Sequence, residues 1–469
     1  MTFCNLGDKL IHTDAVLQAM VAEKIYSILS PFIKPLLKKE GIWLVGGAIR
    51  DAILGLKLSD FDFTVPGSGI EFAKWFAKEI KGRFVLLDED RDEGRVVYRK
   101  KLTFDFSGME DIDSDLGRRD FTMNSMAIKL PNSHILDPFD GKKDIHDKKI
   151  RMIRDDSLKE DPLRILRAFR FQATLGFDIE EETQKAMENY KELLHSVAKE
   201  RIRNEFLPIL EYSDSHTILF SMAKSGVLDI ILKEVTPMRN VPQNKFKGNL
   251  LRHSILTVKR MEHLNSSIRN MDYIRDYLKD KMYVLKLAAL LHDIGKPYCM
   301  SRNQKGELHF YGHERIGEQL INESVREELR LSNKELKSLS ILVRYHMRPH
   351  LLARESPPTQ RAVYRLVKDA GADTPGLLLL AYADAFGSRE IKKKNLLQVI
   401  KAGIDTMKEM DKPKFKRLIT GYDLIAMGLE PGPIFKKILN KVEEAQIAGN
   451  LKTKDEALSF VRQNFLSNK

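Results

Sequence analysis

Cysteine is almost missing from this chain of 469 residues, which contains only Cys4 and Cys299. Two thiols exclude a disulfide framework and a zinc site made of cysteines, and they fit a reducing compartment. An uninterrupted apolar run of about 20 residues, the length that crosses a bilayer, is also missing, and the N-terminus carries acids and a lysine in place of a signal core. We therefore expect a cytoplasmic protein that does not enter a membrane.

Internal repeats and low-complexity segments are missing as well, and the length excludes a single core, because domains usually hold roughly 100 to 200 residues. Positive charge is in excess: 78 lysines and arginines against 66 acidic residues give a net charge of +12. This balance favours a polyanionic partner such as nucleic acid. Many basic proteins bind nothing specifically, so the charge alone decides little.

The hydrophobic pattern changes once along the chain. Residues 15–40 are helix-like as far as Pro35, and a further helix is expected from Ala48. Strands are expected at 42–45, 61–65, 84–87, 95–99, 103–106 and 126–130. Beyond Asp161 and Pro162, apolar residues recur at spacings of three and four, which predicts helices up to the C-terminus. The fold class is therefore α+β, a mixed first part followed by a helical remainder.

Two acids separated by one residue, Asp60 and Asp62, lie within an expected strand. Because side chains alternate along a strand, both carboxylates share one face while Phe61 and Phe63 point into the core. Magnesium ions between these carboxylates and a triphosphate would relieve their repulsion, since hard cations prefer oxygen ligands. An isolated pair of this kind is more often a solvated turn, so the interpretation depends on neighbouring motifs.

The motif at 45–51 ends nine residues before Asp60, and its glycine pair, Gly46 and Gly47, joins a strand to a helix. Backbone without a Cβ can approach a phosphate at Gly47, and the helix N–H groups and the guanidinium of Arg50 suit phosphate oxygens. A glycine pair alone is an ordinary tight turn. Asp105, inside an apolar strand, is either a third acid that acts as base for an attacking 3′-hydroxyl or a simple strand-edge acid.

These motifs precede the block Arg118-Arg119-Asp120-Phe121-Thr122-Met123-Asn124. In this order they resemble the class II tRNA nucleotidyltransferase and bacterial poly(A) polymerase superfamily. The resemblance implies a polymerase-beta-like nucleotidyltransferase head that uses Mg²⁺. It also implies that Arg119 touches the incoming nucleotide and that Asp120 reads its ribose, whereas Arg118 is expected to be a solvated or phosphate-steering charge.

Residues 160–171 resemble the neck-helix motif of the same family. The resemblance implies that Asp161 and Arg164 hydrogen-bond the edge of the incoming C or A and so replace a nucleic-acid template. Arg167 and Arg170 would face the phosphates or hold this pair in place. On a helix the charged positions step by three along one face, while Leu163, Leu166 and Phe169 turn towards the core. Asp161 before a proline is also a good helix cap, which is a purely structural alternative.

A second constellation begins with His292 and Asp293 at the end of an apolar helix, where burial without a metal would be costly. With His253, His313, His346 and Asp384, their order resembles the HD phosphohydrolase superfamily. The resemblance implies one divalent metal on His253, His292, Asp293 and Asp384, and it leaves His313 and His346 as possible ligands of a second ion. Imidazole and carboxylate suit Mn, Ni, Fe or Co. We expect His134 and His350 at the surface; a degenerate HD fold kept for structure is the alternative.

The C-terminal segments 418–424 and 428–433 resemble a signature of CCA-adding enzymes, although a helix-capping turn fits them equally well. The domain division that we predict is an N-terminal helical extension (1–22), a nucleotidyltransferase head (23–149), a helical neck (150–212), an HD domain (213–411) and a helical tRNA-binding tail (412–469). The oligomeric state is left open.

The resemblance implies that C and A residues are added to the tRNA 3′ end from CTP and ATP, with release of pyrophosphate. Full CCA-adding enzymes usually carry an arginine-containing flexible loop where this chain has only the short acidic segment 106–117. Enzymes without that loop tend to stop after two cytidines, so we predict a CC-adding member, unless a loop such as 88–94 replaces the missing one. The alternatives are a poly(A) polymerase, or an RNA-binding protein with an inactive transferase site and an HD domain that hydrolyses nucleotides.

Overall fold

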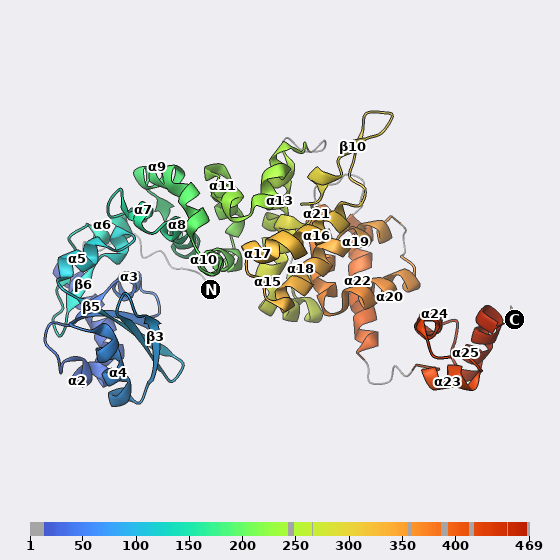
Figure 1. The fold of residues 1–469 in the computed structure, drawn as a ribbon, viewed down its shortest axis with the longest axis horizontal. Helices are drawn as coiled ribbons and strands as arrows, with labels where there is room; N and C mark the ends of the chain where they lie inside the picture. The colour runs from blue at the N-terminus through green and yellow to red at the C-terminus, as the bar shows by residue number, and fades with distance from the viewer. Residues whose placement is uncertain are drawn as a thin grey trace. The chain divides into compact units, whose positions relative to one another are not determined.

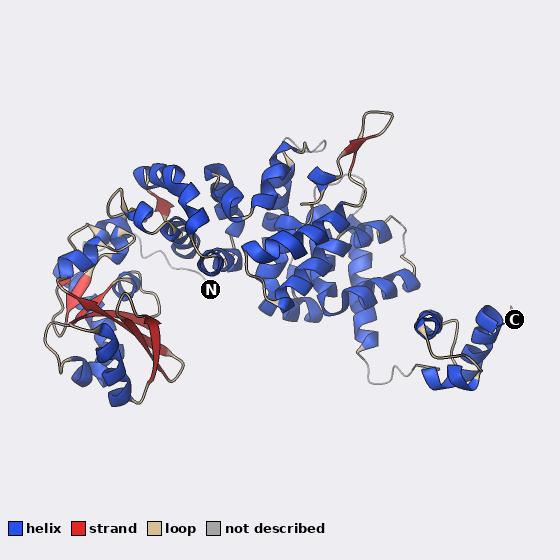
Figure 2. Ribbon diagram, in the orientation of Figure 1, coloured by secondary structure: helices blue, strands red, loops and turns tan. Residues whose placement is uncertain are grey.

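The computed structural model describes residues 14–242, 248–264, 266–354, 358–385, 393–411, 417–447 and 449–466. The chain folds as two compact units, Met1–Val197 and Ala198–Lys469. Figure 1 traces both along the sequence, and Figure 2 shows that the large sheet belongs to the first unit while the second is almost wholly helical. The predicted α+β fold, with a mixed head followed by helices, is confirmed.

The sheet of the first unit has seven strands in the order β3-β4-β5-β2-β1-β6-β7. Its strands are β1 (Trp43–Val45), β2 (Asp60–Pro66), β3 (Arg83–Asp88), β4 (Glu93–Tyr98), β5 (Leu102–Met109), β6 (Ala127–Lys129) and β7 (Ile135–Leu136). Only β2 and β5 run parallel, and the other neighbours are antiparallel. All six expected strands form. The strand β7 and the small pair β8 (Lys149–Ile150) and β9 (Asp178–Ile179) were not anticipated.

One face of this sheet is closed by helix α4 (Gly69–Ile80), which packs on β4 and β5. Phenylalanines from strands and helix meet there with ring centroids 5.0 to 6.5 Å apart: Phe61, Phe63, Phe72, Phe76, Phe104 and Phe106. Each buried ring contributes about 1.5 to 3 kcal/mol of transfer free energy. Because strand side chains alternate, burying Phe61 and Phe63 turns Asp60 and Asp62 to the opposite face.

The helices of the first unit are α1 (Asp14–Leu29), α2 (Ile33–Leu36), α3 (Gly47–Ile53), α4, α5 (Ile112–Gly117), α6 (Gly141–His146), α7 (Ser157–Glu160), α8 (Leu163–Leu175) and α9 (Glu181–Tyr190). The segment Asp14–Leu36 is long and apolar enough to cross a membrane by length and composition alone. However, α1 packs on α3, and Ile25, Leu29 and Leu36 are buried. This segment therefore contributes to the core of the unit.

The second unit contains α10 (Lys199–Glu211), α11 (Ser215–Ser225), α12 (Val227–Ile231), α13 (Leu250–Glu262), α14 (Ser266–Arg269), α15 (Asp272–Leu291), β10 (Ser301–Arg302), β11 (Leu308–His309), α16 (His313–Leu320), α17 (Arg326–Glu328), α18 (Asn333–Tyr345), α19 (Met347–Leu352), α20 (Gln360–Ala370), α21 (Thr374–Ala385), α22 (Lys393–Met410), α23 (Gly421–Ala426), α24 (Pro433–Ile447) and α25 (Lys454–Val461). The core of this unit lies where α15 packs on α13, α18 and α21. Nearly all side chains of α21 are buried, as expected for a helix that is apolar on every face.

The last three helices enclose a small core of their own, built from Ile419, Leu424, Ile438, Val442, Leu451, Ala457 and Val461. The signature segment at 418–424 starts α23, where Thr420 and Asp423 form a reciprocal capping box. The predicted break at Lys412 and Pro413 and the first 13 residues of the predicted N-terminal extension lie outside the described residues. The five-domain division stays a prediction.

Candidate active site and second metal centre

The first site lies on the face of the parallel strand pair β2 and β5 that points away from the phenylalanine core. Asp62 on β2 is the register partner of Asp105 on β5. Asp60, two residues before Asp62 on the same face, is exposed at the start of β2 and accepts a hydrogen bond from Ser59 Oγ at 2.7 Å. The three predicted acids therefore come together on one surface, as strand alternation requires.

This clustering changes the acidity of Asp62. Burial raises the pKa of Asp62 to about 6, and the nearby carboxylates of Asp105 and Asp60 act in the same direction, while Arg119 opposes them. The ionised form of Asp62 is thus disfavoured in the bare protein. The donor set consists of carboxylate oxygens only, so the residues fit a hard divalent cation such as Mg²⁺.

Asp105 has a partner that the sequence pattern did not reveal. Arg95 on β4 is its register partner and donates from Nε and Nη2 to the two carboxylate oxygens, both at 2.7 Å. Two parallel bonds of this kind fix the orientation of a carboxylate. The signal was present in the sequence as an arginine at the start of the expected strand 95–99.

The glycine turn brings Arg119 beside the acids. Gly46, just before α3, has a φ of 77°, and a Cβ there would lie 2.6 Å from Arg119 Nη1 and 3.3 Å from Asp62 Oδ2. Gly46 is therefore the position that requires glycine, because a side chain would be strained and would displace the guanidinium. Gly47, which we predicted, begins α3. Arg119 is held from the other side by Asp115 at 3.0 Å.

Arg50 and Asp120 are buried and bonded to each other through Asn124. Arg50 Nη1 donates to Asn124 Oδ1 at 2.6 Å, and Asn124 Nδ2 donates to Asp120 Oδ1 at 2.9 Å. Arg167 on α8 donates to Asp120 Oδ2 from Nε at 2.9 Å and from Nη2 at 2.7 Å. Burial alone would raise the pKa of Asp120, but Arg167 and the hydrogen bonds outweigh it and lower the pKa to about 2.

The predicted base-reading pair lies at the start of α8. Asp161 accepts a hydrogen bond from Leu163 N at 3.3 Å, as its capping alternative requires. Arg164 donates to Ser157 O at 3.1 Å and to the carbonyl of Arg118, whose own side chain is exposed. Burial lowers the pKa of Arg164. Leu163, Leu166 and Phe169 are buried as predicted, whereas base reading itself stays a prediction.

The second site lies in the second unit, where the ends of several helices meet. Asp293, just after α15, presents Oδ2 to His292 Nε2 at 3.2 Å and to His253 Nε2 at 3.8 Å. Its Oδ1 faces His313 Nε2 at 3.4 Å and His346 Nε2 at 3.5 Å. His253 Nε2 also lies 2.9 Å from Asp384 Oδ1 on α21. Five of the six predicted ligands therefore form two groups that share Asp293, and Asp384 joins them through His253 and His292.

The histidine rings are oriented for metal binding. Nδ1 of three of these rings lies 2.7 to 2.9 Å from a backbone carbonyl, namely Ala289 O for His292, Phe310 O for His313 and Val343 O for His346. These bonds turn the three Nε2 atoms towards the site, where those of His313 and His346 lie 3.1 Å apart. His292 Nε2 and Asp293 Oδ1 are buried without a hydrogen-bond partner among the described residues, so the donor set fits a bound cation.

The expectation for His350 was wrong, whereas His134 is exposed as predicted. His350 is 4% exposed, and its Nε2 lies 3.0 Å from Asp384 Oδ2, although the two atoms are not aligned for a hydrogen bond. It follows His346 by four residues, so one helical turn carries it to the same face. Lys296 was also missed; its Nζ lies 2.6 Å from Asp293 Oδ2.

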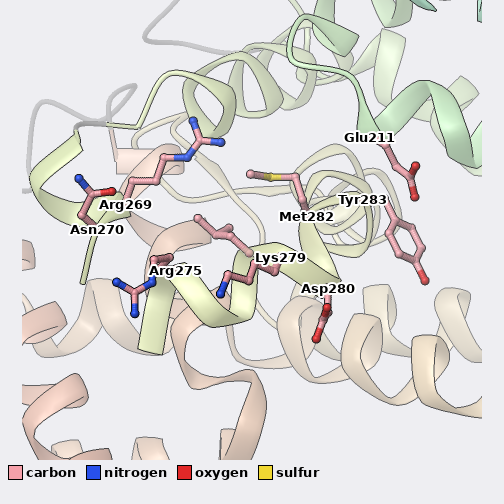
Figure 3. A pocket seen from close by; sticks show the side chains of 9 residues that line it. Glu211, Arg269, Asn270, Arg275, Lys279, Asp280, Met282 and Tyr283 are labelled. Carbon is pink, nitrogen blue, oxygen red and sulfur yellow. The ribbon is translucent and has the colours of Figure 1, made fainter. Parts of the chain in front are cut away.

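A pocket outside both sites opens along the first half of α15. Figure 3 shows Arg269, Arg275 and Lys279 there together with Glu211 and Asp280. The cations are already neutralised in part, since Arg275 lies 3.2 Å from Asp272 and Lys279 lies 3.2 Å from Asp276. Its mixed charge points to no single ligand.

Comparison with protein families assigns four segments. The poly A polymerase head domain matches residues 42–107 and 88–151, and the probable RNA- and SrmB-binding site of polymerase A matches 176–239. The HD domain matches 250–388, and a putative domain 2 of tRNA nucleotidyltransferase matches 323–461. The head and HD matches imply dependence on divalent metal ions.

Curated relatives match over most of the chain. An A-adding tRNA nucleotidyltransferase of Deinococcus radiodurans is 29% identical and covers 90% of this chain and 95% of its own length. A CC-adding tRNA nucleotidyltransferase of a Synechocystis species is 27% identical over 90% and 92%. A multifunctional CCA protein of Actinobacillus pleuropneumoniae is 32% identical over 69% and 79%.

Solved structures share the fold. A Thermotoga maritima CCA-adding enzyme complexed with tRNA has a TM-score of 0.65 at 23% identity, covering 95% of this chain and 98% of that one. A CCA-adding enzyme complexed with CTP has a TM-score of 0.68 at 23% identity, covering 96% and 99%. From the family matches and the relatives, the chain belongs to the class II tRNA nucleotidyltransferase family and carries an HD domain behind its transferase head.

Proposed function

We propose that this protein adds cytidine residues from CTP to the 3′ end of tRNA, releases pyrophosphate and stops after two additions. The observation that carries nucleotidyl transfer is the cluster of Asp60, Asp62 and Asp105 beside the guanidinium of Arg119. The basic net charge and the relatives' names support tRNA as the acceptor. A reducing, cytoplasmic location fits the two cysteines.

In this proposal Asp60 and Asp62 would hold Mg²⁺, which supplies charge neutralisation for the triphosphate. Arg119 binds the triphosphate, and the α3 N-terminus behind Gly46 and Gly47 offers backbone N–H groups to its oxygens. Asp105, held by Arg95, is oriented to accept the proton of the tRNA 3′-hydroxyl. Asp161 and Arg164 select the base by hydrogen bonds to its edge.

The stop after two cytidines rests on the connection between β5 and α5. The strand runs to Met109 and the helix begins at Ile112, so two residues join them. The other candidate loop is a short hairpin between β3, which ends at Asp88, and β4, which begins at Glu93. Neither offers a long movable segment to reshape a cytidine pocket for a larger purine.

Addition of only the terminal A is the second candidate, because the Deinococcus radiodurans relative, similar over 95% of its length, carries that name. Three acceptors separate the products: tRNA ending before the first C, tRNA ending in CC, and an unstructured RNA. With CTP and ATP supplied together, we expect sequenced products that end in CC from the first acceptor and no extension of the others. CCA on the first acceptor, A on the second or a poly(A) tail on the third would each replace this proposal.

We further propose that the HD domain is a metal-dependent phosphohydrolase whose centre holds two divalent ions, with Mn, Ni, Fe or Co as candidates. His253, His292 and Asp384 would hold one ion, His313 and His346 the other, and Asp293 would bridge them. Such a centre supplies Lewis-acid activation for hydrolysis of a phosphoester.

Metal analysis of the protein reconstituted with Mn²⁺ tests this second proposal. We expect two equivalents in the parent protein and one in His313→Ala or His346→Ala. One equivalent in all three proteins would contradict a two-ion centre.

A further inference from the structure

The two acids of the HD centre are held in different ways. Asp293 is 1% exposed, and Lys296 Nζ lies 2.6 Å from its Oδ2. Asp384 lies in the last turn of α21, and 18% of its side-chain surface is exposed. Its Oδ1 lies 2.9 Å from His253 Nε2 and 3.6 Å from His292 Nε2. The carboxylate that faces these two histidines therefore lies at a freer position than Asp293, and a partner at its other oxygen would fix it.

His350 faces that other oxygen. It is 4% exposed, it lies on α19, which packs on α21, and its Nε2 is 3.0 Å from Asp384 Oδ2. Both ring nitrogens are buried without a hydrogen-bond partner among the described residues. The distance is that of a hydrogen bond, and only the direction of the ring departs from one, which a rotation about the Cβ–Cγ bond changes. Asp384 also raises the pKa of Arg260 on α13, against the effect of burial. Asp384 is therefore an acceptor that the buried imidazole has within reach.

The acceptor beside His350 faces a different nitrogen from those beside the neighbouring rings. In His292, His313 and His346, Nδ1 faces a backbone carbonyl, and since a carbonyl only accepts, that nitrogen carries a proton. In His350 a carboxylate oxygen faces Nε2 instead, so the neutral ring is expected to carry its proton there. A nitrogen that carries a proton does not bind a metal ion. His350 is thus arranged as a donor to Asp384 and not as a seventh ligand.

We propose that His350 is a positioning residue of the HD centre. It donates from Nε2 to Asp384 Oδ2 and so keeps Oδ1 turned to the ion that His253 and His292 share. The inference rests on the proposed metal centre and extends it beyond the ligands themselves. Partners that orient a ligand in this way typically contribute about ten- to a hundredfold in metal affinity. Removing the donor should therefore weaken metal binding without removing a ligand.

The experiment titrates Mn²⁺ into the metal-free full chain and its variants by calorimetry. For His350→Leu we expect the affinity for one ion to fall by about tenfold or more, while two equivalents still bind at saturation. His350→Gln places an amide donor near the position of Nε2 and should stay within about threefold of the parent affinity. His263→Leu, which removes an exposed imidazole just after α13, is the control and should match the parent.

Nitrogen NMR of the parent protein locates the proton of His350 directly and serves if His350→Leu does not fold. With isotopically labelled histidine and Zn²⁺ as a diamagnetic substitute, one ring signal should disappear in His350→Gln. We expect that signal to come from a ring that is protonated at Nε2 and not bound to metal. A ring protonated at Nδ1 with metal at Nε2 would overturn the inference.

Three results of the titration would also contradict it. One bound equivalent in His350→Leu at saturating Mn²⁺ would make His350 a ligand. Unchanged affinity with lower thermal stability would make it purely structural, and an equal loss in His350→Gln would show that packing of the ring matters and its donor does not. A parent protein that binds no Mn²⁺ would refute the proposed metal centre itself, which is a different result.

Discussion

The acid cluster of the head and the histidine centre of the HD domain are constructed in opposite ways. In the transferase head, carboxylates project from neighbouring strands onto a surface, and Asp60 is exposed. In the HD domain, ligands from helix ends face one another, and His292, Asp293 and His346 are at most 1% exposed. In our proposal a cation and a triphosphate complete the first site, whereas the residues of the second are nearly enclosed by protein.

The difference follows from what each scaffold can offer. A strand inside a sheet places oxygen ligands two residues apart on one face, which can stay open for a large substrate. Helix ends bring residues distant in sequence together, and backbone carbonyls then fix each imidazole by its Nδ1 atom. We therefore expect readily exchanged Mg²⁺ in the head and a firmly held transition metal in the HD domain.

The largest effect should come from the open site. Asp62→Ala removes a carboxylate that would bind the metal, so we expect nucleotide addition to fall by about a thousandfold or more. Binding of tRNA, measured by filter retention, should stay near that of the parent, because basic surface and not this acid holds RNA. Substantial residual addition by a folded variant would contradict the assignment.

Loss of the HD metal centre should leave nucleotide addition by the head unchanged. Asp293→Ala removes the shared carboxylate, so we expect loss of bound transition metal and of any phosphoester hydrolysis. Extension of tRNA by the same preparation should continue at the parent rate, since the transferase residues all lie in the other unit. A collapse of extension in a folded variant would mean that the two sites are coupled.

A moderate effect is expected from Arg164 on α8, which we propose to read the base. Arg164→Ala should weaken discrimination among CTP, ATP, UTP and GTP by about 1 to 3 kcal/mol, while triphosphate affinity changes less. Competition between nucleotides on one tRNA measures the ratio directly. Equal loss for all four would show that Arg164 binds a group that all nucleotides share.

The last effect concerns the stability of the folded head and not its activity. Since burial raises the pKa of Asp62 to about 6, the metal-free folded state gains a proton that the unfolded state lacks between about pH 4 and pH 6. Stability is therefore highest below this window and falls as pH rises through 6. Asp62→Asn stays neutral, so it should be more stable than the parent by about 1 to 3 kcal/mol at pH 7.5 without metal.

Urea unfolding at pH 7.5 and pH 4 checks this, and the advantage of Asp62→Asn should disappear at pH 4. Asp60→Asn, at an exposed position, is the matched control and should change stability little. Equal free energies of unfolding for Asp62→Asn and the parent at both pH values would show that ionised Asp62 does not destabilise the folded state.

The head was predictable where a local pattern carries the information. Alternation of acids and phenylalanines at 60–63 indicated the strand and its two faces, and the strand forms with Phe61 and Phe63 buried. Arg95 was missed because its role depends on how β4 pairs with β5. Only that register places Arg95 opposite Asp105. His350 was misassigned because polarity suggests a surface, while burial depends on which helix packs over it.

What the sequence alone determined is the set of chemical groups and their order: the acid pair, the arginine block, the neck helix motif and the histidines and aspartates of the HD domain. The acid pair follows from residue type and spacing along one strand, whereas the other three sets were identified by their resemblance to known families. Tertiary structure alone decided that Gly46 rather than Gly47 lies against Arg119, that Asn124 bridges Arg50 and Asp120, and that Asp293 faces two groups of histidines. Each of these depends on distances of about 3 Å between side chains far apart in the chain, and only packing sets such distances.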